Sequence, residues 1–122
     1  MSEKTSPTVL HLRFRLRVPP DALLGHCRRA AEKIASAEGL IWKIWLVQEE
    51  QQEMGGTYLF TDREAAMDYL NHPIIQAVCS NPAVMSVDSQ LWEAEESLSA
   101  LTRGPLRDIR IQEPAAMMAG GR

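Results

Sequence analysis

The run from Leu40 to Val47 (LIWKIWLV) constrains the fold of this chain more than any other segment, because it is apolar on both faces of a strand. Aromatic and β-branched residues crowd into a short stretch, which predicts a β-strand. Trp42 and Trp45 are three residues apart, so they fall on opposite faces and at most one of them lines a given cavity. Lys43 is the only charged residue in the run.

A return strand follows this run and completes a hairpin between Gly39 and Asp62. The wholly polar segment from Gln48 to Glu53 is typical of a hairpin tip. Gly55-Gly56 leaves room for a bulge or for the close approach of another backbone. The residues of 57–60 (TYLF) are then expected to form the third strand.

The first strand is predicted from Thr8 to Val18 by strict alternation. Its apolar face consists of Leu10, Leu12, Phe14, Leu16 and Val18. Its cationic face consists of His11, Arg13, Arg15 and Arg17. We expect these cations either to pair with acids such as Asp88, Glu93 or Glu95, or to hold an anionic or phenolic group, since arginine suits oxyanions.

The other elements are predicted to be helices and one more strand. A helix from Pro20 to Glu38 has a buried stripe, and Gly39 is the expected C′ residue. Thr61-Asp62-Arg63-Glu64 fits a capping box at the start of a second helix. His72-Pro73 is expected to interrupt that helix. A fourth strand from Val84 to Trp92 and a short helix from Glu95 to Arg103 complete the pattern.

The order β-α-β-β-α-β predicts an α+β, ferredoxin-like fold with both helices on one side of an antiparallel sheet. The length suits one domain, which we place at residues 1–104. Residues 105–122 are expected to be a partly flexible C-terminal extension, in which residues 106–112 could add a short strand.

Strand 40–47 lies at an edge of the sheet in this topology, where an uncovered apolar strand would aggregate. A second copy of the chain is the simplest cover. We therefore predict a homodimer that forms through the sheet face and through strand 40–47.

Composition excludes several classes of function. A net charge of −3 does not favour nucleic-acid binding. No apolar run reaches the ~20 residues of a membrane span, and the polar start lacks a secretion signal, so a cytoplasmic location is expected. Cys27 and Cys79 both lie in apolar helical patterns and are expected to be buried free thiols. Three isolated histidines lack zinc spacing and no nucleotide-binding motif occurs, so no metal or cofactor is expected.

The segments GLIWKIW (39–45) and GGTYLFTD (55–62) closely resemble the YdhR-type mono-oxygenase family of small bacterial proteins. The likeness extends over roughly residues 8–103, and the GGTYLFTD segment is its most specific part. It implies a dimeric α+β barrel and a cofactor-independent mono-oxygenase that acts with O₂ on a small aromatic substrate, such as a phenol or an anthrone.

Such a reaction needs a base or hydrogen-bond acceptor, a group that stabilises a phenolate, and a pocket closed to water. His72 has a suitable intrinsic pKa for a base, although a residue before proline is more often a helix cap. Tyr58 and Tyr69 could orient a substrate hydroxyl, or could be structural tyrosines with backbone partners.

Four further residues are candidates for substrate binding. Trp42 and Trp45 could line the pocket, or could simply pack in the core or interface. His11 and Arg13 could hold the anionic group. The alternatives to an oxygenase are a non-catalytic carrier or sensor of a small hydrophobic or aromatic ligand and, less favoured, a haem-binding barrel.

Overall fold

The computed structural model describes residues 6–107. A four-stranded sheet is accompanied by a short 3-10 helix and four α-helices in these residues. The elements in chain order are β1 (Thr8–Leu16), η1 (Pro20–Leu23), α1 (Leu24–Ala35), β2 (Leu40–Gln48), β3 (Glu53–Phe60), α2 (Arg63–Leu70), α3 (Pro73–Cys79), β4 (Val84–Glu93) and α4 (Glu96–Leu101).

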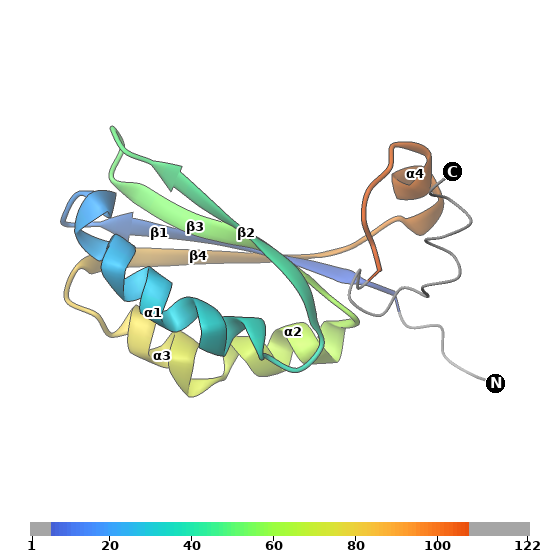
Figure 1. The fold of residues 1–122 in the computed structure, drawn as a ribbon, viewed down its shortest axis with the longest axis horizontal. Helices are drawn as coiled ribbons and strands as arrows, with labels where there is room; N and C mark the ends of the chain where they lie inside the picture. The colour runs from blue at the N-terminus through green and yellow to red at the C-terminus, as the bar shows by residue number, and fades with distance from the viewer. Residues whose placement is uncertain (1–5, 108–122) are drawn as a thin grey trace, which may run out of the picture.

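The sheet has the strand order β2-β3-β1-β4, and every neighbouring pair is antiparallel. Figure 1 shows α1, α2 and α3 on one side of the sheet, with α4 at the end of the molecule where β1 begins and β4 ends. This is the predicted ferredoxin-like α+β fold. As expected, β2 lies at an edge of the sheet.

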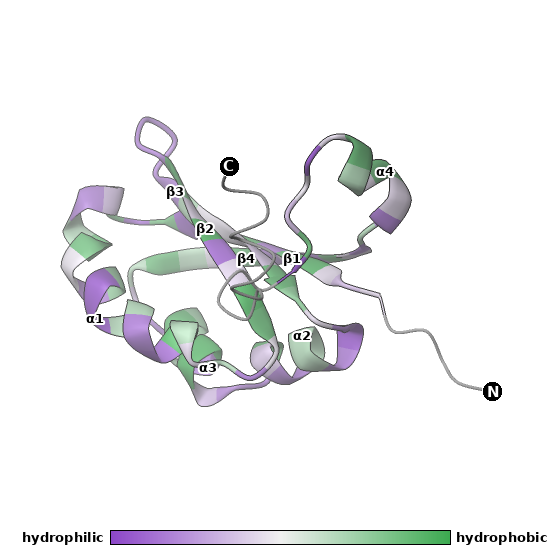
Figure 2. Ribbon diagram, turned by 45° about the vertical axis from the view of Figure 1, so that its right-hand side comes forward, coloured by the Kyte–Doolittle hydropathy of each residue, from purple (hydrophilic) through white to green (hydrophobic). Residues whose placement is uncertain are grey.

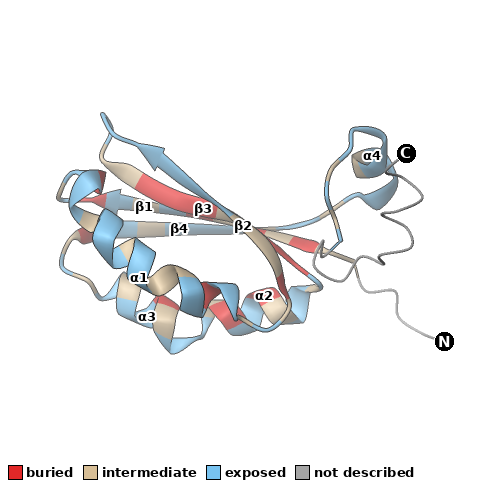
Figure 3. Ribbon diagram, in the orientation of Figure 1, coloured by how far each residue is buried: buried red, intermediate tan, exposed pale blue. Residues whose placement is uncertain are grey.

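The core lies between the sheet and these three helices. Alternation along β1 directs Leu10 and Leu12 to the helix side, where both are almost fully buried. Tyr58 and Phe60 of β3 join them there. Figure 3 shows burial concentrated in β3 and the inner sides of the helices, while β4 and the end of β2 are exposed.

The opposite side of the sheet, which we call the open face, is apolar at its two edges. Ile44 of β2 is 54% exposed and Trp92 of β4 is 61% exposed. Leu46 lies on the same side of β2 as Ile44. Figure 2 shows hydrophobic segments along the strands, whereas the hairpin tip is hydrophilic. The protomer alone therefore leaves much apolar surface in contact with water.

The middle of the open face is polar, and its two arginines contact an acid that the sequence had not suggested. Arg13 and Arg15 contact Glu53, with Nε–Oε distances of 3.8 and 3.4 Å. Glu53 was not among the acids expected, because the sequence placed it in the hairpin tip. In the structure it begins β3 directly opposite Arg15. His11 Nδ1 lies 3.0 Å from the Thr57 hydroxyl oxygen.

Several predicted boundaries move by a few residues. β1 ends at Leu16, and β3 begins at Glu53 rather than at Thr57. The first helix ends at Ala35, so Gly39 is not its C′ residue, although its φ of 83° is left-handed as expected. The second helix is interrupted at His72-Pro73, as the sequence predicted.

Other details differ in burial or in position. Cys79 is exposed, because the short α3 buries only Ile75, whereas Cys27 is half-buried; both thiols are free. The backbone of Gly55 approaches β1 closely, while the bulge of the hairpin is at Ile41, where the β2–β3 register shifts. α4 begins after Glu95, whose side chain accepts a hydrogen bond from Leu98 N.

The expected capping box at α2 is replaced by a simpler cap. Asp62, not Thr61, is the N-cap residue, and its Oδ1 accepts a hydrogen bond of 2.9 Å from Ala65 N. Extended dihedral angles at Asp62 (φ −160°, ψ 176°) aim its carboxylate at the first turn. A carboxylate also suits the positive end of the helix dipole.

We expect Asp62→Ala to lower the free energy of unfolding by about 1 kcal/mol, because the N–H groups of the first turn lose their acceptor. Thr61→Ala is the matched control and should change it by less than about 0.5 kcal/mol, as expected for an exposed residue outside the cap. Urea denaturation of both variants measures the difference. Equal losses of stability in the two variants would support the capping box predicted from the sequence, in which the Thr61 side chain also caps the helix.

The segment after α4 returns to the sheet. The Trp42 indole N–H donates a hydrogen bond of 2.7 Å to the Pro105 carbonyl oxygen. The possible strand at residues 106–112 lies almost entirely outside the described residues. Within residues 6–107, no helix is both long enough and apolar enough to cross a membrane.

Candidate functional site

A cavity of about 80 Å³ lies between the helix side of the sheet and the helices α1, α2 and α3. Most of its lining is apolar side chain. Its polar or ionisable lining residues are His26, Cys27, Lys43, Tyr58, Tyr69 and Asn81. The lining contains no Asp or Glu.

Lys43 is directed into this cavity by the alternation of β2. Its strand partner on β3 is Tyr58, and Trp45 on the same side of β2 is opposite Gly56. A Cβ atom on Gly56 would lie 2.6 Å from Lys43 Cε, so the missing side chain leaves room for the lysine stem. Gly56 and the strand register together direct the lysine stem inward, over β3.

The Lys43 ammonium group lies on aromatic rings rather than beside a carboxylate. Its Nζ is 3.3 Å from the centroid of the Trp45 ring and 4.6 Å from that of Tyr58. The faces of aromatic rings attract cations. Burial lowers the pKa of Lys43 from 10.5 to about 8, and the nearby Cys27 opposes this only in part. Near neutral pH, Lys43 can therefore hold or release a proton.

Tyr58 and Tyr69 form a buried hydroxyl pair at the cavity, with an O···O distance of 3.2 Å. Their ring centroids are 5.0 Å apart, and Phe60 packs against both rings. Burial is the main cause that raises the pKa of each phenol. Both tyrosines stay protonated at neutral pH, so they act as hydrogen-bonding groups and not as bases.

Cys27 on α1 is the remaining ionisable group that interacts with Lys43. Burial raises the pKa of its thiol, and the charge of Lys43 opposes that shift more weakly. The thiol therefore stays protonated at neutral pH. Within residues 6–107, no group of three or more His, Cys, Asp or Glu side chains is arranged to hold a metal ion.

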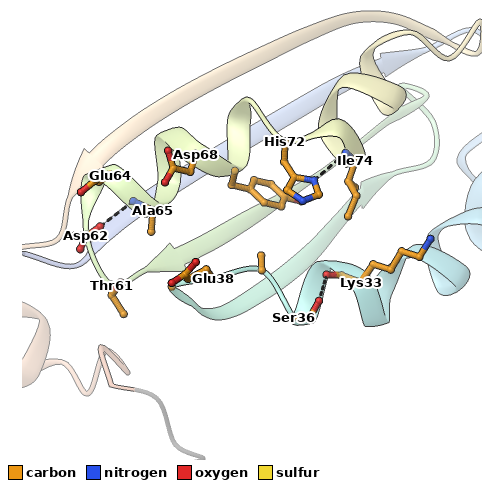
Figure 4. Close-up of a pocket in the computed structure, with 13 residues that line it drawn as sticks. Lys33, Ser36, Glu38, Thr61, Asp62, Glu64, Ala65, Asp68, His72 and Ile74 are labelled. Atoms are coloured by element: carbon orange, nitrogen blue, oxygen red, sulfur yellow. Dashed lines mark hydrogen bonds between the residues drawn. The ribbon is translucent and has the colours of Figure 1, made fainter.

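A second, larger hollow of about 830 Å³ is an open groove between the end of α1 and the helices α2 and α3. Figure 4 shows the carboxylates of Glu38, Asp62, Glu64 and Asp68 around it. His72 lies in this groove as the N-cap of α3, where its Nδ1 accepts a hydrogen bond of 3.1 Å from Ile74 N. The groove is open to solvent, so it does not offer the water-free setting that the predicted chemistry needs.

The predicted site residues thus fall into three places. The cavity brings together Trp45, Tyr58 and Tyr69. Trp42, His11 and Arg13 are on the open face, because they alternate with the inward-facing residues of their strands. His72 is exposed in the groove.

Lys43 was missed as a site residue. The sequence did carry a signal, since Lys43 is the only charge in a run that is otherwise apolar on both faces. Burying a charge in such a run is costly unless a partner offsets the cost. An isolated lysine in an apolar strand is therefore a sequence signal for a functional residue.

The cavity as it stands is smaller than a typical ligand pocket of ~300–1,000 Å³. A neighbouring groove of about 230 Å³ runs between α1 and β2 and shares Cys27, Trp45 and Met54 with it. Trp45 therefore lies at the boundary between the two spaces, and its side chain is 40% exposed.

The lowered pKa of Lys43 predicts a pH-dependent stability. The folded protein releases this proton near pH 8, whereas the unfolded chain holds it up to about pH 10.5. Between these values the unfolded state binds more protons, so the free energy of unfolding rises with pH by at most about 1.4 kcal/mol per unit. Above about pH 9 this rise is opposed, because thiols and then tyrosines ionise in the unfolded chain while Cys27 and Tyr58 stay protonated in the fold.

Urea denaturation between pH 7 and pH 10 tests this, with Lys43→Met as the comparison. The variant should be more stable than wild type at pH 7, by on the order of 1–2 kcal/mol, and its stability should not rise with pH in this range. If the free energy of unfolding rises equally with pH in both proteins, the pH dependence comes from a group other than Lys43.

Comparison with known proteins gives one family match and several structural likenesses. The family model described as "Putative mono-oxygenase ydhR" matches residues 9–105. A search of curated proteins found no significant match.

Solved structures similar to this one share its fold at low sequence identity. SnoaB, a cofactor-independent oxygenase from Streptomyces nogalater, is 18% identical with a TM-score of 0.61, over 76% of this chain and 97% of that chain. A putative antibiotic biosynthesis monooxygenase from Nitrosomonas europaea is 8% identical with a TM-score of 0.63, over 79% and 97% of the two chains. The haem degrader MhuD from Mycobacterium tuberculosis is 17% identical with a TM-score of 0.55, over 72% and 95%.

These structural likenesses establish the fold alone, whereas the family match covers most of the 122 residues, including both segments of the β2–β3 hairpin that suggested the family. The chain belongs to the ydhR family of putative mono-oxygenases.

Proposed function

We propose that this protein is a cofactor-independent mono-oxygenase, active as a homodimer, which oxidises a small phenol or anthrone-like substrate with O₂. The observation that carries the proposal is the apolar cavity beneath the sheet, where a lysine and a pair of tyrosine hydroxyls form a small polar group. Family membership and the fold shared with SnoaB support it.

The cavity residues suit the needs of such a reaction. An electron-rich substrate must lose a proton before it can pass electrons to O₂. In an anthrone the CH₂ group becomes a carbonyl with one oxygen atom from O₂, and the other oxygen atom leaves as water. Trp45 would stack on the aromatic rings, and the Tyr58–Tyr69 pair would hydrogen-bond a substrate oxygen. The apolar walls would exclude water.

Of the residues first considered for catalysis, Tyr58 keeps a place in this proposal and His72 does not. His72 Nδ1 accepts the hydrogen bond from Ile74 N that caps α3, and the groove around His72 is open to solvent. Trp42, His11 and Arg13 would lie in the dimer interface instead of the substrate pocket.

The homodimer would cover the open face. Its apolar edges at Ile44, Leu46 and Trp92 flank a polar centre that holds His11, Arg13 and Glu53. A stable interface buries about 800 Å² per partner, and a four-stranded sheet face offers an area of that order. The cytoplasmic location stays a prediction.

Oxygen consumption tests the function. Purified protein treated with a chelator is mixed with a panel of anthrones and polyphenols, and O₂ uptake is compared with the protein-free rate. At least one substrate should be consumed faster with protein, and Tyr58→Phe should slow its consumption. Silence across the whole panel would contradict the proposal.

The same preparation separates the alternatives. A carrier or sensor would show ligand-induced thermal stabilisation with no O₂ uptake. A haem-binding barrel would shift the Soret band of added haem, and the likeness to MhuD makes that titration worth performing.

A further inference from the structure

Lys43 is a partly buried cation that has no anionic partner among the described residues lining its cavity. The elements packed around it contribute the thiol of Cys27 from α1 and the phenols of Tyr58 and Tyr69 from β3 and α2. His26 on α1 is exposed at the margin, and α3 contributes Ile74, Ile75 and Val78. Within residues 6–107 no lining residue is a carboxylate, and the charge lies against the rings of Trp45 and Tyr58 instead.

Such an arrangement is costly for the free protein. A partly buried charge without an anionic partner loses part of its hydration, and a cation–π contact returns only ~0.5–2 kcal/mol. The chain nevertheless makes room for the lysine by having glycine at position 56, where a Cβ atom would lie 2.6 Å from Lys43 Cε. A methionine or leucine at position 43 would fill the same space without that cost, which suggests that the charge acts on a ligand.

We propose that Lys43 is the oxyanion-binding residue of the cavity, and that it pairs with the ionised oxygen of a bound phenol or enol. This inference rests on the proposed function for the substrate class, but not on turnover. It explains why the only charge in β2 faces inward and why the cavity has no carboxylate of its own.

Proton transfer between the two groups balances without any other reactant. The neutral amine of Lys43 accepts the proton, so the O–H bond of the phenol breaks and an N–H bond forms. The product is an ammonium–phenolate pair in which each charge has a partner. The pKa of about 8 places the amine close to the range in which electron-rich phenols and enols ionise.

Cys27 is a weaker candidate for the same role. Burial raises the pKa of its thiol, and a protonated thiol is a poor partner for an anion. The tyrosine pair supplies hydrogen bonds but no charge. Among the described residues of the cavity lining, Lys43 is therefore the one that combines a positive charge with partial burial.

Binding of para-nitrophenol under anaerobic conditions tests the proposal, because this phenol absorbs visible light only as its anion and is not turned over. We expect the pKa of the bound probe to lie about one to three units below that of the free probe, as an opposite charge in contact produces. Lys43→Met should abolish this shift, and Lys43→Arg, which keeps the charge, should retain it.

Lys33→Met is the matched control, since Lys33 is an exposed lysine of α1 that does not line the cavity. It should leave the shift unchanged. Circular dichroism establishes that each variant is folded. An unshifted bound probe in wild type, no binding of the probe, or a full shift in Lys43→Met would overturn the proposal. If the pKa of the bound probe shifts but no substrate is oxidised with O₂ uptake, Lys43 binds anions and the proposed oxygenase function is wrong.

Discussion

Replacing Gly55 by alanine should destabilise the protein by about 3 kcal/mol, enough to threaten folding of a domain of this size. A Cβ atom at Gly55 would lie 2.1 Å from the Leu12 carbonyl oxygen and 3.2 Å from Arg13 Cα. These are backbone atoms of β1, one of the two central strands, so they cannot move aside as a flexible side chain would. The new methyl group would force β3 away from β1 at the middle of the sheet.

Gly25→Ala is the matched control for this substitution. The nearest atom to its new Cβ would be Arg29 Nη1 at 3.6 Å, an ordinary van der Waals contact, and the position is helical. Alanine should therefore stabilise the chain by about 0.5 kcal/mol. Urea denaturation measures both, and a loss below about 1 kcal/mol for Gly55→Ala would show that the β1–β3 backbone contact is not tight.

Placing a charge at the centre of the exposed strand should dissociate the proposed homodimer. In Ile44→Glu each protomer would bring a carboxylate to the proposed interface, which pairs the same surface on both copies, so the cost would be incurred twice. Two buried and unpaired carboxylates should raise the dimer dissociation constant at least about 100-fold. The protomer fold should survive, because Ile44 is 54% exposed there.

Met67→Glu controls for the loss of an exposed apolar residue as such. Met67 is 40% exposed on α2, in the helical layer on the other side of the sheet. Sedimentation at a series of concentrations should therefore show wild type and Met67→Glu as dimers and Ile44→Glu as monomers. A wild-type monomer throughout, or a dimer unaffected by Ile44→Glu, would rule out the open face as the interface.

The fold was predictable because its determinants are local. Alternation marks β1, the crowded apolar run marks β2, and the residue before a proline must leave the helical region, which marks the break at His72-Pro73. The details that depend on partners far along the chain were not predictable. Glu53 pairs with Arg15 only because strand register places them opposite one another.

The candidate site was harder to predict from the sequence, because its contacts also depend on residues far apart along the chain. Tyr58 and Tyr69 were both considered, but their 3.2 Å contact depends on how α2 packs on β3. In the sequence, Lys43 only interrupts an apolar pattern. The strand register places it opposite Tyr58 and beside Trp45, where the missing side chain of Gly56 leaves room for it. Thr61 and Asp62 compete for the same cap, and backbone geometry decides between them.

The most direct measurement of the central claim is the fate of isotopically labelled O₂ in a reaction with an anthrone or phenol consumed by the purified, chelator-treated protein. A cofactor-independent mono-oxygenase predicts a product that carries one labelled oxygen atom and forms faster than in the protein-free control, without added metal, flavin or reductant. A product whose new oxygen comes from water, or a rate equal to the protein-free rate for every substrate of the panel, would contradict the account.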